Sequence, residues 1–177
     1  MFVPVLIAVV AIIVILLVVI ALRKPTFRYE RSITINAPAA AAFALVNDFH
    51  KWEAWSPWEK VDPNTKRTIT GAQSGVGAKY AWEGNKNVGS GHMEILESKP
   101  NELIKIDLVF LKPMPGHNTT EFTFKQEGNN VIVTQAMYGC NSFMGKVFGL
   151  FMNMDKMIGG QFEKGLADIK RLAEASK

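Results

Sequence analysis

Three kinds of hydrophobic pattern follow one another along the chain, and each predicts a different type of element. The first is an apolar run from Phe2 to Leu22 that contains no charged residue. As a helix this run would rise about 31 Å, which matches the roughly 30 Å hydrocarbon core of a bilayer. It predicts a transmembrane anchor over residues 1–24. A cleaved signal peptide is the alternative, but that would need a basic segment before the run and a shorter apolar core.

A short alternation and then a helical spacing follow the apolar run. Residues 25–30 are expected to form a short tether, and residues 32–36 alternate between polar and apolar side chains, which predicts a strand. In the Ala-rich segment 38–49 apolar side chains recur at helical spacing. A second short helical segment is expected over 48–55, because Pro57 disfavours helical backbone in the residue before it.

From Lys66 onward the hydrophobic period becomes two, which predicts a series of strands. The expected strands cover residues 66–71, 75–84, 89–98, 103–112, 118–127 and 130–139. Turn-forming residues such as Gly, Pro and Asn separate them. Connections this short force consecutive strands to pair in antiparallel fashion.

An apolar stripe runs along the C-terminal segment 142–175 and predicts one long helix. Gly159 and Gly160 interrupt the middle of this segment and predict a kink. A curved antiparallel sheet of seven strands must cover its apolar face, and this helix is the one long enough to do so. The prediction is therefore an α+β fold in which the sheet wraps around the C-terminal helix, with two short helices between the first two strands.

Particular sequence segments add a family resemblance to this element order. They are ITINAPAAAAFALVNDF, WEAWSPWEKVDP, GVGAKYAWEGN, GHMEILES and the closing FEKGLADIKRLAE. With these segments, residues 31–177 resemble the START-like helix-grip superfamily, also called SRPBCC, and within it the polyketide cyclase/dehydrase-type branch. The resemblance implies an apolar cavity between the sheet and the long helix. It implies no single activity, because one such fold carries many functions.

Charge bears on location and partners more than on fold. The chain has 20 basic and 16 acidic residues, and Arg23 and Lys24 directly follow the apolar run. Without these two cations the remainder is nearly balanced and shows no basic stripe, which argues against nucleic-acid binding. Their position predicts a single-pass membrane protein with its N-terminus outside and its C-terminal domain in the cytoplasm. The lone Cys140 agrees, because one thiol cannot form an internal disulfide.

Aromatic and methionine side chains are the candidate ligand contacts. Trp52, Trp55 and Trp58 recur every three residues, and they suit a packed aromatic plug, a ligand-facing lip at the cavity mouth or, less well, a membrane contact. On the fold that the resemblance implies, the predicted ligand-binding residues are Trp55, Trp58, Tyr80, Trp82, Phe110, Met137, Phe151 and Met154. Each of them could instead be an ordinary core residue, and the methionines near the helix start are expected first as core.

The sequence predicts no catalytic residue, no metal ligand set and no cofactor. His50, His92 and His117 are scattered and lack metal-ligand spacing. Two possible proton-transfer pairs, His92 with Glu94 and His117 with Glu121, are expected on solvated strand faces. Cys140 is expected to be a buried, inert thiol.

Three functions remain open from the sequence. The favoured one is a membrane-anchored domain that binds a hydrophobic or amphipathic small molecule, lipid-like or polycyclic, between sheet and helix. A cyclase- or hydratase-like enzyme on a polyketide-type substrate is the first alternative, and it requires an ionisable side chain inside the cavity. A protein-interaction or chaperone-regulator module is the second, and it requires a filled core and a large exposed apolar patch.

Overall fold

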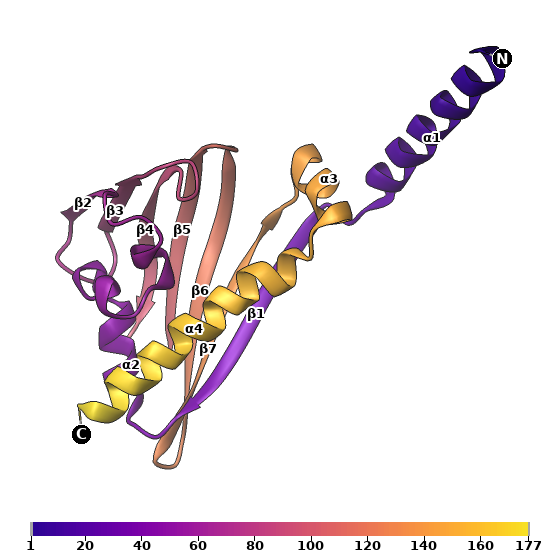
Figure 1. Cartoon of the computed structure of the whole chain (residues 1–177). Helices are drawn as coiled ribbons and strands as arrows, with labels where there is room; N and C mark the ends of the chain where they lie inside the picture. The colour runs from indigo at the N-terminus through magenta and orange to yellow at the C-terminus, as the bar shows by residue number, and fades with distance from the viewer. Residues whose placement is uncertain (1, 177) are drawn as a thin grey trace.

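A computed structural model describes residues 2–176 and shows an N-terminal helix projecting from a domain built on one sheet (Figure 1). The elements in chain order are α1 (Phe2–Leu22), β1 (Thr26–Ile35), α2 (Ala39–Val46), η1 (Phe49–Ala54), η2 (Pro57–Lys60), β2 (Lys66–Gly71), β3 (Ala78–Glu83), β4 (Ser90–Lys99), β5 (Leu103–Lys112), β6 (Gly116–Glu127), β7 (Asn130–Cys140), α3 (Phe143–Phe151) and α4 (Met154–Ala175). The predicted α+β fold is confirmed, and α1 has the length and apolar composition of a membrane-spanning helix.

All seven strands form one antiparallel sheet in the order β1-β7-β6-β5-β4-β3-β2. The sheet curves, and α4 crosses its concave side diagonally beside β1 and β7 (Figure 1). We call this side the inner face. It carries Phe122 and Phe124 of β6, and Phe124 meets Phe43 of α2 edge to face. Short α2 and the two 3-10 helices close one end of the space beneath α4.

The first strand starts earlier than the sequence predicts. Thr26 already pairs with Cys140, so residues 26–30, which the sequence suggests as a tether, lie within β1. Only Arg23, Lys24 and Pro25 separate α1 from the sheet. The pattern in this segment is easy to miss, because β1 is an edge strand whose side chains are nearly all exposed or half-buried.

The predicted long C-terminal helix is confirmed as α4, but it begins at Met154 rather than at Ser142, because the segment 142–175 forms two helices. Met152 adopts an extended backbone conformation and separates α3 from α4. The Asn153 side chain then begins α4 by accepting a hydrogen bond from the Lys156 N–H at 2.9 Å. Gly159 and Gly160, the predicted kink, lie inside α4, which runs on through both residues.

The three tryptophans of the segment 52–58 lie in two different environments. Trp52 and Trp55 are buried, and their indole N–H groups donate to the carbonyls of Val46 and Leu45 at 2.9 and 3.0 Å. Both rings lie against Phe122 of the inner face. Trp58 is 46% exposed on η2. The first two are therefore the packed aromatic plug, and they lie across the domain from α1.

Candidate ligand-binding site

Beyond the tryptophan plug the inner face continues toward α1 as rows of side chains on neighbouring strands. One row brings together Tyr29, Met137 and Thr120, because Met137 is paired with the other two across β1 and β6. Met137 and Thr120 are buried, whereas Tyr29 is half-buried. The inner face is thus mostly covered at this end, and it becomes accessible near β1.

An aromatic cluster forms the part of the inner face contributed by β3 and β5. Trp82 lies edge to face against Phe110 with ring centroids 5.7 Å apart, and Tyr80 follows at 6.3 Å from Trp82. Gly91 makes this arrangement possible: it is paired with Trp82, and a Cβ at this position would collide with the indole ring. Trp82 and Phe110 are only half-buried, so this cluster offers apolar contact area to a ligand.

Polar groups also lie on the inner face. Gln135 is 8% exposed and lies between Arg31 of β1 and Phe122 of β6. Its side-chain Oε1 is buried and has no hydrogen-bond partner among the residues that the structure describes. A buried carbonyl without a partner is uncommon, because leaving it unpaired costs free energy. It is therefore a candidate acceptor for a ligand hydroxyl or N–H.

A groove of about 460 Å³ opens between α3, the start of α4 and the start of β1. Its apolar lining comes from the end of α3, the turn after it and the first residue of α4: Leu150, Phe151, Met152 and Met154. Arg23 and Lys146 add positive charge to the same lining, and Asp155 adds a carboxylate that Arg31 already binds. Tyr29 belongs both to the groove and to the inner-face row beside Met137, so the groove adjoins the interior.

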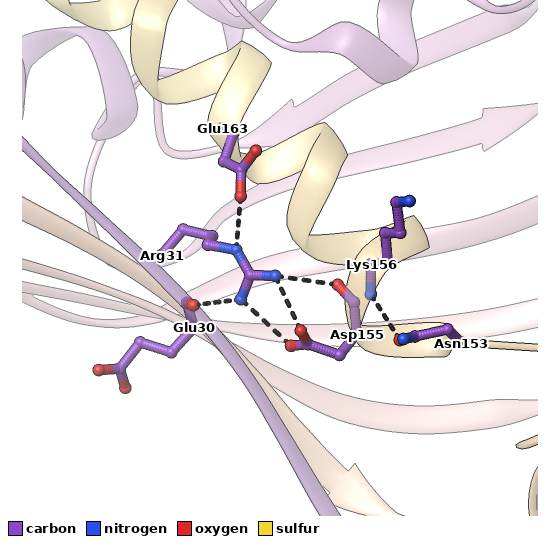
Figure 2. Close-up of polar contacts among 6 residues, drawn as sticks. All are labelled: Glu30, Arg31, Asn153, Asp155, Lys156 and Glu163. Carbon is purple, nitrogen blue, oxygen red and sulfur yellow. Dashed lines mark hydrogen bonds and ion pairs between the residues drawn. The ribbon is translucent and has the colours of Figure 1, made fainter.

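Arg31 holds the start of α4 in place beside this groove (Figure 2). Its guanidinium donates to both carboxylate oxygens of Asp155, at 3.1 and 2.9 Å, and to the Asp155 carbonyl at 3.2 Å. It also donates to Glu163 and to the Glu30 carbonyl, each at 2.7 Å. All five N–H donors of the guanidinium are therefore used. A single side chain of β1 thus contacts the first three turns of α4.

The sequence of α4 provides the space for this contact. A Cβ on Gly159 would collide with the Arg31 guanidinium, whereas a Cβ on Gly160 would meet nothing within 4 Å. Hydrogen bonding to Arg31 lowers the pKa of Asp155 below its ordinary value, and the same bonds raise the pKa of Arg31. Gly159 is therefore a close-approach position rather than a hinge.

Tyr80 brings an ionisable group to the inner face, away from the groove. The Tyr80 hydroxyl donates to a Glu59 carboxylate oxygen at 2.6 Å, and Arg67 pairs with the other oxygen. Burial first, and then the bond to Glu59, raises the pKa of Tyr80 far above its ordinary value. This cluster connects η2 to β2 and β3, and each polar group in it has a partner.

A family model described as polyketide cyclase / dehydrase and lipid transport matches residues 26–174. The chain belongs to this family. The match begins where β1 begins and ends within α4, so the whole sheet and both C-terminal helices belong to the family domain. No curated protein matches the chain in sequence.

Solved structures with the same helix-grip fold have low sequence identity to this member of the family. Protein CV1439 from Chromobacterium violaceum has 16% identity and a TM-score of 0.59, with 85% of this chain and 97% of that chain covered. The di-domain ARO/CYC protein BexL from the BE-7585A biosynthetic pathway has 13% identity and a TM-score of 0.63, over 89% of this chain and 53% of that chain. Aha1 from Colwellia psychrerythraea has 15% identity and a TM-score of 0.56, over 85% and 98%. At these identities the likeness concerns the fold.

The eight predicted ligand contacts of this family member fall into four places. Tyr80, Trp82, Phe110 and Met137 lie on the inner face, and Phe151 and Met154 line the groove. Trp55 belongs to the buried plug, and Trp58 lies on the outside. Ligand binding by these residues stays a prediction.

Other polar predictions are confirmed or corrected by the structure. His92 and Glu94 lie on the outer side of β4, where Glu94 pairs with Lys79, as expected for a solvated strand face. His117 is also exposed, as expected, and its ring bonds Asp107 and not Glu121, the residue considered as its proton-transfer partner. Cys140 is exposed, so the prediction of a buried thiol is wrong: β7 ends there, beside the first residue of β1.

Sequence reasoning missed Arg31 and Gln135, the two polar residues that shape the site. Arg31 stood at the boundary of the expected tether, and its partners lie more than a hundred residues away. Gln135 sits in a strand whose two faces are both largely apolar, so alternation gave no sign of which way it pointed. The one available signal was a polar side chain in an otherwise apolar strand.

Proposed function

We propose that this protein is a membrane-anchored domain that binds a hydrophobic or amphipathic small molecule between its sheet and its C-terminal helices. In this proposal α1 crosses the bilayer and the domain lies on the cytoplasmic side. The ligand enters by the groove and extends past Tyr29 toward Met137 and the aromatic cluster on the inner face.

The observation that carries this proposal is the composition of the groove. Apolar side chains, two cations and the Asp155 carboxylate, which Arg31 already binds, line the same space of about 460 Å³, which is within the size range of small-molecule sites. Apolar walls favour a hydrocarbon or ring system, and Arg23 with Lys146 favours an anionic group at one end. Gln135 would accept a hydrogen bond from a polar group further in.

The family supports binding as the common property of its members. Its description joins cyclisation or dehydration of polyketides with lipid transport, and all of these require an apolar molecule to be held. Catalysis has less support in this chain, because all three histidines lie on the outside and the Tyr80 hydroxyl is already bonded to Glu59. We therefore favour binding without turnover.

Photo-crosslinking tests the proposal in the full chain. The protein is incorporated into lipid vesicles with a fatty acid that carries a diazirine on its chain, irradiated, and digested for mass spectrometry. We expect adducts on α4 and on the inner-face strands in addition to adducts on α1. Adducts confined to α1 would contradict the proposed site, because any membrane-embedded helix would acquire those.

A matched pair of methionine variants makes the crosslinking specific to the groove. Met154 lines the groove, whereas Met157, one helical turn further on, is 46% exposed outside it. A bulky indole at position 154 should fill the groove, so Met154→Trp is expected to lose the inner-face adducts. Met157→Trp serves as the control and is expected to keep them. Equal labelling of both variants would place the ligand elsewhere.

A further inference from the structure

Helix α3 is an apolar helix that the domain does not bury. Among the described residues of α3 none is buried, and Phe143, Met144, Phe148 and Phe151 are each more than one-third exposed. Phe151 reaches 79% exposure. Soluble proteins seldom leave such side chains together on one short helix, so a contiguous exposed patch marks an interaction surface.

The helix has two distinct faces. Met144, Phe148 and Phe151 follow one another at helical spacing and share one face, whereas Gly145 and Gly149 occupy another. The glycine face turns toward the domain: the Arg23 guanidinium donates to the Gly149 carbonyl at 2.7 Å, and both glycines line the groove. The apolar face is therefore free at Met144 and Phe148, and Phe151 lies where this face meets the groove.

The break at Met152 makes this exposure a fixed feature of the fold. Arg31 fixes the first turns of α4 on β1 (Figure 2). The extended backbone at Met152 ends α3 and directs it away from the α4 axis. As a result α3 leaves the inner face and lies beside the end of α1 (Figure 1). Arg23, which contacts α3, is the residue directly after the last residue of α1.

Charge around α3 also suits one kind of partner. Arg23, Lys24 and Lys146 lie at this end of the domain, and no carboxylate is within ion-pair distance of any of them in the described part of the chain. The sequence contains no acidic residue from Phe2 to Tyr29 or between Glu127 and Asp155. Unpaired cations beside an apolar helix face match an anionic lipid surface.

We propose that α3 lies in the headgroup region of the same bilayer that α1 crosses, with its Met144–Phe148–Phe151 face in the lipid. This inference rests on the proposed function for the membrane position of α1, and it adds where the ligand comes from. With α3 in the bilayer surface, the groove beneath it opens at the level of the lipid headgroups. An amphipathic molecule can then pass from the leaflet into the groove without crossing water.

Spin-label depth measurements on the full chain test the position of α3. Nanodiscs contain phosphatidylcholine with phosphatidylglycerol, and each label is attached to one cysteine in the Cys140→Ser background. Met144→Cys and Phe148→Cys report on α3, and neither residue lines the groove. Ile12→Cys reports on the middle of α1. Lys125→Cys, near the β6–β7 hairpin at the far end of the domain from α1 (Figure 1), is the aqueous control.

The expected result is a clear difference between α3 and the aqueous control. Labels on α3 should collide more with oxygen and less with a water-soluble nickel chelate than the Lys125 label does, at a depth of about 5–10 Å. Nickel access equal to that at Lys125, with the Ile12 label deep in the bilayer, would overturn the inference and leave the anchor intact. An Ile12 label in water would overturn both.

A further outcome would show that protein, and not lipid, covers the apolar face of α3. Labels on α3 that neither oxygen nor nickel chelate reaches would indicate that this face packs against protein, either a second copy or the domain itself. That result would also overturn the inference. All labelled α3 positions are exposed, so the substitutions should leave the fold unchanged.

Discussion

Trp55 is the residue on which the closed end of the domain depends most. Its indole is 2% exposed, lies 4.8 Å from the Trp52 ring centroid and packs beneath Gly165 of α4. Removing a buried ring of this size leaves a cavity that the neighbours cannot fill. We expect Trp55→Ala to lower the free energy of unfolding by about 3–5 kcal/mol.

Trp58 provides the matched control for this substitution. It belongs to the same motif but is 46% exposed, so Trp58→Ala should change the free energy of unfolding by no more than about 0.5 kcal/mol. Urea unfolding of the full chain in detergent micelles measures both. Equal losses for the two variants would show that the motif acts as one surface feature and would contradict the buried plug.

At the scale of elements, two adjacent glycines of α4 differ in their relation to β1: Gly159 faces Arg31, whereas Gly160 faces open space. Gly160→Ala meets open space, so it should raise the free energy of unfolding by about 0.5–1 kcal/mol through helix propensity. Gly159→Ala must displace the Arg31 guanidinium from Asp155 and Glu163, and we expect it to lower the free energy of unfolding. Hydrogen exchange in the first turns of α4 should increase in this variant alone.

Removing Arg31 completes the comparison of the two glycines. In an Arg31→Ala background the collision partner is gone, so Gly159→Ala should become as favourable as Gly160→Ala. A loss at Gly159 that persists without Arg31 would assign the effect to some other contact. The comparison separates steric conflict from helix propensity, because both glycines lie inside the same helix.

The local pattern of polar and apolar residues predicted several strands correctly. The strands over 66–71 and 103–112 are confirmed residue for residue. In the strand over 103–112 the alternation follows directly from having one covered face. The break at Met152 was not predictable in this way. An apolar stripe continues through it, and only the distant Arg31 and the Asn153 cap determine where α4 starts.

The candidate site was predictable only in part, for a related reason. Alternation correctly placed Tyr80 and Trp82 on one face, but it could not show that Trp82 needs Gly91 opposite it on the next strand. The methionines near the helix start were expected first as core, yet Met144, Met152 and Met157 are each 45–48% exposed. Composition cannot distinguish an apolar helix that covers a sheet from one that leaves it.

At the scale of the whole molecule, the proposed orientation across the bilayer rests on Arg23 and Lys24 and has a direct test. Cys140 is exposed and is the one cysteine of the chain. If the domain is cytoplasmic, a membrane-impermeant maleimide should label Cys140 in right-side-out vesicles only after permeabilisation. The reverse control is Phe2→Cys in a Cys140→Ser chain, which should react without permeabilisation. Labelling of Cys140 in sealed vesicles would reverse the orientation.

The link between α1 and β1 limits how the domain can work. Arg23, Lys24 and Pro25 alone join them, and three residues reach at most about 10 Å. If α1 is the proposed anchor, a domain on so short a link cannot move a ligand from one membrane to another. It would then meet its acceptors by lateral diffusion within the bilayer that holds α1, and an acceptor would have to reach that same bilayer.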